Sequence, residues 1–126
     1  MAREKGKEQK KYDLEKRLVN FAVRVINLAE KFPKSYVGIH IASQLVRSGT
    51  SPAANYGEAQ SSESRSDFIH KMKLVLKELR ESRLWLLIVE RKALIKLADE
   101  LASLLAENNE LISIFVASIA TVQKKR

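Results

Sequence analysis

The residues of this chain that could bind a metal ion or transfer a proton are few, because the sequence has two histidines and no cysteine. Asp67 and His70 are three residues apart, which places them on one face of a helix. Di-iron helical bundles use two such acidic-x-x-His motifs and carboxylates from two further helices. Only one motif occurs in this sequence, so we interpret His70 as a surface or interface residue. We therefore expect no enzymatic activity, no metal centre and no cofactor.

A second candidate site is the small polar stretch RSGTSPAANYGEAQSSESRSDF, residues 47–68, which lies between apolar sequences. A phosphate-binding loop ends in Gly-Lys-Ser/Thr and follows a strand, whereas this stretch contains no lysine. A serine nucleophile of the Gly-x-Ser-x-Gly type is also absent. The spacing of the alanines, Asn55, Tyr56 and Glu58 is helical, which argues against a flexible linker. We interpret the stretch as part of a helix whose small side chains let a neighbouring helix approach closely.

Pro52 should disturb this helix, because proline has no amide hydrogen to donate to the carbonyl of Ser48. The sequence therefore predicts a kink in the second helix. Alternatively, Ser51 could cap a helix that restarts with Pro52 at its first position.

Asn55 and Glu58 are three residues apart and share one face of the same helix. If that face is buried, an arginine must pair with the carboxylate. We assign this structural polar cluster to Arg47, Asn55 and Glu58, with Arg80 and Arg83 as the other candidate arginines. The alternative is a Glu58 side chain in solvent.

The rest of the chain predicts an all-α fold, an antiparallel up-and-down four-helix bundle with a kinked second helix. Apolar residues recur every three or four positions over 12–32, from Ser35 into the small polar stretch, from Ser64 to about Arg91, and over 94–122. Ser35 and Ser64 are candidate N-caps, and Pro33 ends the first segment. We expect a basic N-terminal tail over 1–11, the bundle over 12–122 and a basic C-terminal tail over 123–126.

The third and fourth segments each carry a heptad of apolar residues. The predicted seam of the third is Ile69, Met72, Leu76, Leu79, Arg83 and Leu86, and that of the fourth is Leu94, Leu97, Leu101, Leu104, Asn108, Leu111 and Phe115. Asn108 is interpreted as a register-setting or solvent-facing residue. A second stripe on the fourth segment comprises Leu105, Ile112, Val116 and Ile119, and it predicts contact with another subunit.

The net charge of +8 predicts affinity for an anionic partner such as nucleic acid. Lys73, Lys77 and Arg80 follow one face of the third segment, and Lys124, Lys125 and Arg126 end the chain. These six residues are the predicted nucleic-acid-binding residues, through phosphate contacts without base readout. Seven of the eight aromatic residues lie on or beside apolar stripes, so no aromatic-rich platform for single strands is evident.

The N-terminal residues are basic but are followed by no apolar segment, and the longest apolar runs are too short to cross a bilayer. We therefore expect a soluble cytoplasmic protein that does not enter a membrane.

The central sequence resembles the 23S rRNA intervening-sequence protein family, over most of Asp13 to Val122. The shared residues are Phe32-Pro33, Gln44-Leu45, Arg47-Ser48, Ser51, Ala54-Asn55, Glu58-Ala59, Ser64, Asp67-Phe68, Lys71, Glu78, Glu81 and Trp85-Leu86. The resemblance implies a kinked second helix and a ring-shaped homopentamer. It also implies kinship with accessory proteins of diversity-generating retroelements, basic pentamers thought to bind nucleic acid and a reverse transcriptase. The family has no known catalytic residues.

Two functions remain open from the sequence. The first is a non-enzymatic oligomer that binds nucleic acid, with RNA favoured. The second is a protein-interaction or scaffold module whose basic ends have no nucleic-acid ligand, because a fold by itself does not define a function.

Overall fold

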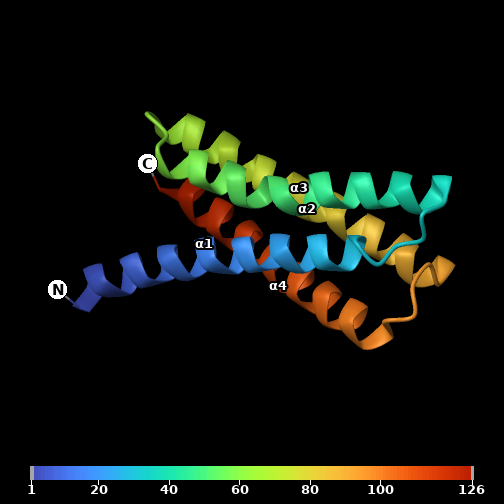
Figure 1. Cartoon of the computed structure of the whole chain (residues 1–126). Coiled ribbons are helices and arrows are strands. Elements are labelled where there is room, and N and C mark those ends of the chain that lie inside the picture. Colours follow the sequence, from blue (N-terminus) through green and yellow to red (C-terminus); the bar gives the residue numbers. More distant parts are fainter. Residues whose placement is uncertain (1, 126) are drawn as a thin grey trace.

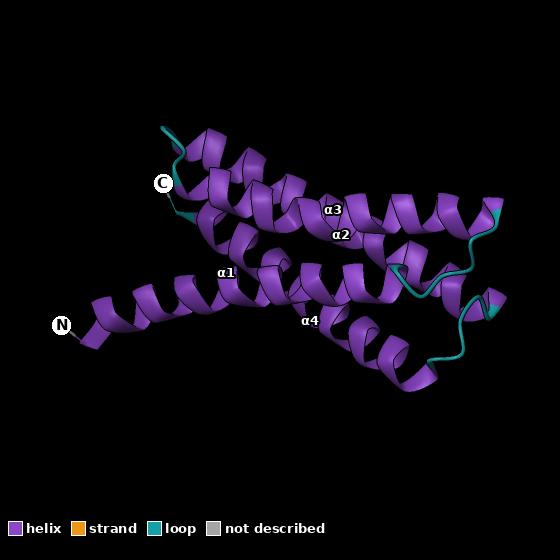
Figure 2. Ribbon diagram, viewed as in Figure 1, coloured by secondary structure: helices purple, strands orange, loops and turns teal. Residues whose placement is uncertain are grey.

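Four helices form the whole of the ordered secondary structure in the part of the chain that is described (Figures 1 and 2). The computed structural model describes the backbone of residues 2–125 and the side chains of residues 13–125. The helices are α1 (Ala2–Ala29), α2 (Tyr36–Gln60), α3 (Arg65–Lys92) and α4 (Ala98–Lys124). No strand occurs among the described residues, which confirms the predicted all-α four-helix architecture.

Two of the helices begin at serines, as the sequence predicts. The Ser35 hydroxyl accepts a hydrogen bond from the Gly38 amide at 3.1 Å, and the Ser64 hydroxyl accepts one from the Asp67 amide at 3.0 Å. Each hydroxyl satisfies one of the amides that a helix leaves free at its first turn. The carboxylate of Asp67 lies in the first turn of α3, where negative charge is favourable.

Helix boundaries differ from the expected ones at three places. α4 continues to Lys124, so the first two residues of the expected C-terminal tail over 123–126 are helical. α1 already begins at Ala2, so residues 2–11, expected as a tail, continue the helix, while their side chains lie outside the described residues. α4 begins at Ala98 and not at Leu94. Ala93 ends α3 in the left-handed conformation with φ 54°, and the amide of Leu94 donates to the carbonyl of Val89. This C-terminal cap turns the chain and keeps residues 94–97 out of a helix.

The helices pack in chain order, α1 against α2, α2 against α3, and α3 against α4 (Figure 1). α1 and α4 meet less closely, and the long side chains of Arg17 and Arg24 bridge them to Glu107 and Ser103. The largest side chains without exposed surface are Leu18, Phe21, Val25, Leu28, Leu45, Val75, Leu79, Leu86, Val89, Leu104, Leu111 and Phe115. All four helices therefore contribute to one core.

The predicted seam of α4 is buried from Leu101 to Phe115, whereas Leu94 and Leu97 lie before the helix and are only partly buried. The predicted seam of α3 is wrong at Ile69, which is only partly buried, and at Arg83. Ser82 is buried, whereas Arg83 is exposed and donates to the amide oxygen of Asn109 at 3.1 Å. A serine can enter this seam because its hydroxyl meets that of Ser48 on α2 at 3.0 Å. Burial of the small polar residue is tolerated because it has a hydrogen-bond partner. An arginine at this buried position would leave its guanidinium without such a hydrogen-bond partner.

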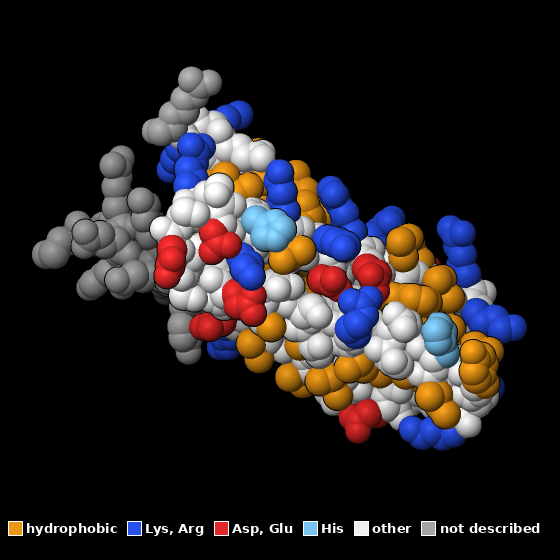
Figure 3. Space-filling view, turned by 90° about the horizontal axis from the view of Figure 1, so that it is seen from above, with side chains coloured by type: hydrophobic (Ala, Val, Ile, Leu, Met, Phe, Trp, Pro, Cys, Tyr) orange, Lys and Arg blue, Asp and Glu red, His pale blue; other side chains and the backbone are white. Residues whose placement is uncertain are grey.

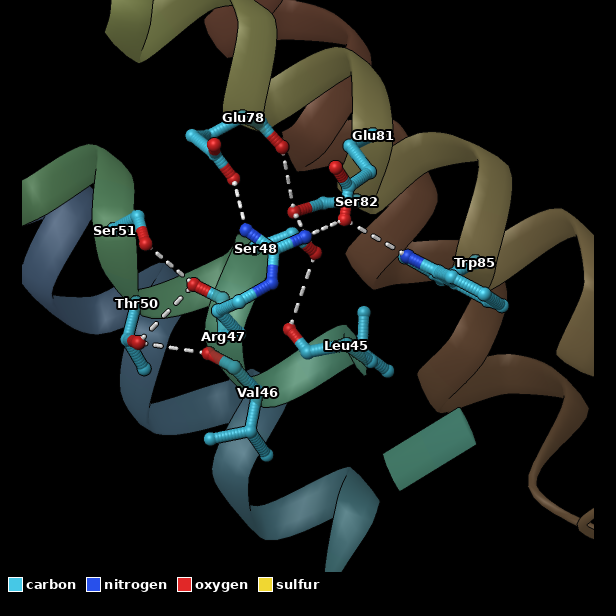
Figure 4. Close-up of polar contacts among 10 residues, drawn as sticks. All are labelled: Leu45, Val46, Arg47, Ser48, Thr50, Ser51, Glu78, Glu81, Ser82 and Trp85. Carbon is cyan, nitrogen blue, oxygen red and sulfur yellow. Dashed lines mark hydrogen bonds and ion pairs between the residues drawn. The ribbon is translucent and has the colours of Figure 1, made fainter. Parts of the chain in front are cut away.

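The small polar stretch is a closely packed part of α2, as interpreted from its composition. Ser48 is fully buried, and a Cβ atom added to Gly49 would lie 2.7 Å from Val25 Cγ1. Pro52 lies inside a helix that continues from Tyr36 to Gln60, so no restart occurs there. Ser51 accordingly does not cap a helix, and its hydroxyl donates to the carbonyl of Arg47 at 2.6 Å (Figure 4). Such bonds to the preceding turn are typical of bent helices.

No helix among residues 2–125 combines the length and the apolar composition needed to cross a lipid bilayer.

Candidate nucleic-acid interface

A strip of basic residues follows the outer face of α3 beside α4. Three shallow hollows adjoin along it, the first and second sharing Arg80, and the second and third sharing Arg83 and Leu84. We call their basic residues the basic strip, namely Lys73, Lys77, Arg80, Arg83, Arg91 and Lys92. No carboxylate lines any of the three hollows. A row of basic side chains with hydrophobic ones between them follows the upper edge of the molecule in Figure 3.

The strip contains three of the residues predicted to bind nucleic acid. Lys73, Lys77 and Arg80 are exposed and line the first hollow together. The floor of this hollow is apolar, formed by Leu76 of α3 and by α4 side chains such as Ile119. The geometry thus places cationic groups around an apolar surface, and it extends the predicted group to Arg83, Arg91 and Lys92.

The predicted C-terminal residues lie near one end of the strip. Lys124 is the last residue of α4, Lys125 caps that helix, and both are exposed. Gln123, one residue earlier, lines the first hollow. Arg126 lies outside the described residues.

Four cations on the other faces of the bundle, Arg17, Arg24, Arg47 and Lys71, are paired with carboxylates. Arg17 contacts Glu107 at 2.6 Å, and Lys71 contacts Glu58 at 3.0 Å. These hydrogen bonds raise the pKa of both Arg17 and Lys71 above the ordinary values. Within the described residues, none of the six cations of the basic strip lies within 4.0 Å of a carboxylate oxygen. The strip is therefore a surface on which six cations gather without a paired carboxylate in the described part of the chain, whereas other unpaired cations, such as Lys16, Lys31 and Lys96, lie outside it.

The expected polar cluster of Arg47, Asn55 and Glu58 is not formed. Arg47 extends from α2 to α3, where it pairs with Glu78 at 3.1 Å and also with Glu81 (Figure 4). Glu58 is 58% exposed and pairs with Lys71, so the alternative of a solvent-facing carboxylate is correct. Asn55 is only partly buried. The cause is the position of Arg47, which lies beside α3 carboxylates that the local spacing on α2 does not reveal.

Glu81 also anchors an aromatic group that the sequence analysis missed. The indole nitrogen of Trp85 donates to Glu81 Oε2 at 3.1 Å. The ring of His40 meets that of Trp85 edge-on with centroids 6.2 Å apart, and Tyr36 stacks on His40 with centroids 6.3 Å apart. The spacing of Tyr36 and His40, four residues on one helix, is the sequence signal for the first contact. The contact with Trp85 depends on the packing of α2 against α3.

The Asp67 and His70 pair has no surrounding ligand set. The described residues contain no group of three or more His, Asp or Glu side chains placed to hold a metal ion. Asp67 instead lies in the first turn of α3, next to the capping Ser64.

The fold and the strip together define a small, basic, four-helix-bundle protein. The chain belongs to the 23S rRNA-intervening sequence protein family, whose model matches residues 10–117. This match confirms the resemblance noted in the sequence.

A crystal structure of a protein with unknown function from the S23 ribosomal protein family of Bacteroides thetaiotaomicron has a similar fold, with a TM-score of 0.80. The two sequences are 31% identical over 88% of this chain and 98% of the other. No curated protein matches this sequence. Neither the family description nor that of the similar structure indicates an enzymatic activity.

Proposed function

We propose that this protein is a non-enzymatic nucleic-acid-binding protein, with RNA as the favoured ligand, and that it contacts phosphates through the basic strip. The observation that carries the proposal is the gathering of unpaired cations along one face of α3. Six cations line three adjoining hollows without a carboxylate, whereas Arg17, Arg24, Arg47 and Lys71 are paired with Glu side chains. Unpaired cations in a row provide the charge that a polyanion neutralises.

The dimensions of the strip suit an extended polyanion. Lys73 and Lys92 lie nineteen residues apart on one helix, which corresponds to roughly 28 Å at about 1.5 Å per residue. Lysine and arginine contacts to phosphates position a nucleic acid but do not read its sequence. We therefore expect binding with little sequence preference.

The test is a comparison of two triple charge reversals. The strip variant is Lys73→Glu, Lys77→Glu, Arg80→Glu, and the matched control is Lys16→Glu, Lys31→Glu, Lys96→Glu, three exposed lysines outside the strip. Both change the net charge of +8 by the same amount. Each lost phosphate contact lowers the slope of log affinity against log salt by about 0.7 for a single strand.

We expect the strip variant to lose about two units of that slope and at least ~10-fold in affinity for a mixed-sequence RNA, by fluorescence anisotropy. The control variant should lose much less. Equal losses in the two variants would show that only net charge matters. Absence of binding by the unmodified protein at low salt would refute the proposal.

A second candidate, a protein-interaction module, is favoured by a different observation. Val19, Val23 and Ile26 lie on one face of α1 and are 46%, 49% and 39% exposed. Adjacent exposed apolar side chains are typical of surfaces that another protein covers. Copurification of the tagged protein, with identification of bound RNA and protein, distinguishes the two candidates.

A further inference from the structure

An exposed stack of aromatic rings lies where α2 begins. Tyr36 is the first residue of α2 and His40 follows one turn later, with their rings inclined by only 13°. Tyr36 as a whole residue is 85% exposed, the highest value among the exposed large hydrophobic residues. The ring thus lies nearly parallel to that of His40, with centroids 6.3 Å apart, while most of the residue is open to solvent.

The base of the stack is held in place by α3. His40 meets Trp85 edge-on at 79°, an arrangement in which the positive edge of one ring meets the negative face of the other. Trp85 is fixed in turn by its hydrogen bond to Glu81, which also binds Arg47. A rigid support under an open aromatic ring loses little conformational entropy when a planar group binds.

Trp85, which supports the stack, and the end of the basic strip lie on the same stretch of α3. Leu84 and Ile88, next to Trp85 and three residues after it, line the third hollow with Arg91 and Lys92. They are 57% and 43% exposed, so the apolar surface continues from the strip toward the stack. At the end of the molecule opposite the grey residues, hydrophobic and basic side chains lie next to one another (Figure 3).

We propose that Tyr36 binds an unpaired nucleobase by stacking, with His40 and Trp85 as its support, while Arg91 and Lys92 contact the neighbouring phosphates. The inference rests on the proposed function and narrows its ligand to single-stranded RNA or to the unpaired parts of a folded RNA. Aromatic side chains stack on bases regardless of sequence, because every base has a π face. A base inside a duplex is already stacked and cannot reach the ring.

The experiment measures the affinity of Tyr36→Ala and Tyr36→Phe for a 12-nucleotide mixed-sequence RNA and for a blunt duplex of the same length. Tyr36→Ala should weaken binding to the single strand about 10-fold, a typical loss for one stacked base, and leave binding to the duplex unchanged. Tyr36→Phe keeps the ring and should bind like the unmodified protein. The salt slope should be the same in all three proteins, because no phosphate contact is lost.

The exposed position of Tyr36 means that the fold should survive the substitution, which circular dichroism verifies. Unchanged single-strand affinity in Tyr36→Ala, or an equal loss for the duplex, would overturn the base site. If the strip variant then still showed its lower salt slope, the proposed function would stand without the stacking contact. Absence of RNA binding by the unmodified protein would overturn both.

Discussion

Asn108 is the residue at which the core departs most clearly from an apolar seam. Its side chain has no exposed surface, and its Nδ2 donates to the carbonyl of Leu79 at 3.2 Å. Its Oδ1 is buried without a hydrogen-bond partner among the described residues. An unpaired buried oxygen costs more free energy than a single neutral hydrogen bond returns. Because Asn108 is buried, the solvent-facing alternative for this residue is wrong, and its role in setting the register of the helices stays a prediction.

We predict that Asn108→Leu keeps or raises the free energy of unfolding, by up to about 1 kcal/mol. Leucine has a similar volume, and the Leu79 carbonyl lies inside α3, where a helix amide also bonds to it. Urea denaturation at fixed protein concentration measures the change. Asn108→Ala is the control and should be destabilised because it leaves a cavity. A large loss of stability in Asn108→Leu would mean that the Oδ1 atom has a partner in solution.

At the scale of the elements, the approach of α1 to α2 depends on one glycine. Gly49 lies so close to Val25 that an added Cβ atom would clash with its side chain. A Cβ atom added to Gly57, on the same helix, would have no atom within 4 Å. The two positions share a helix and differ in packing alone. They form a matched pair for measuring how tightly the helices fit.

We predict opposite effects of alanine at these positions. Gly49→Ala should lower the free energy of unfolding by about 1–3 kcal/mol, because the helices must separate to admit the methyl group. Gly57→Ala should raise it by about 0.5–1 kcal/mol, because alanine restricts the unfolded chain and favours the helix. Urea denaturation of both variants is the measurement. Equal stability of Gly49→Ala and the unmodified protein would show that α1 shifts at little cost.

For the whole molecule, exposed apolar surface predicts self-association. Besides the α1 residues Val19, Val23 and Ile26, Val116 of the second α4 stripe is 43% exposed. Ile119 of that stripe is buried, so the intramolecular core covers only part of it. The family resemblance and this uncovered surface lead us to expect a homo-oligomer, with a pentamer as the expected state.

Light scattering at micromolar concentration should then give a mass about five times that of the 14.3 kDa chain. The mass should persist at high salt, because apolar contacts are not screened as exposed charges are. A mass near that of one chain would contradict the prediction. A mass that falls as salt rises would point to association through charge.

Much of the architecture could be predicted from the sequence, because its causes are local. The caps at Ser35 and Ser64 bond to amides three residues away, and the α4 seam follows from apolar spacing on one helix. Small residues in α2 indicated that a neighbouring helix approaches closely, but not that α1 brings Val25 against Gly49. The start of α4 at Ala98 was not predicted, since the left-handed Ala93 carries no glycine to mark it.

The sequence by itself determined four helices, two of their N-caps, the buried part of the α4 seam from Leu101 to Phe115 and three of the cations on the outer face of α3. Tertiary structure alone decided which side chains meet across helices. It paired Arg47 with Glu78 and Glu81 in place of Glu58, and it set Trp85 beneath His40 and Tyr36. The physical reason is the distance along the chain over which each interaction acts. Capping and periodicity act within one or two turns of a chain, whereas a salt bridge or ring contact between helices depends on the rotation and offset with which they pack.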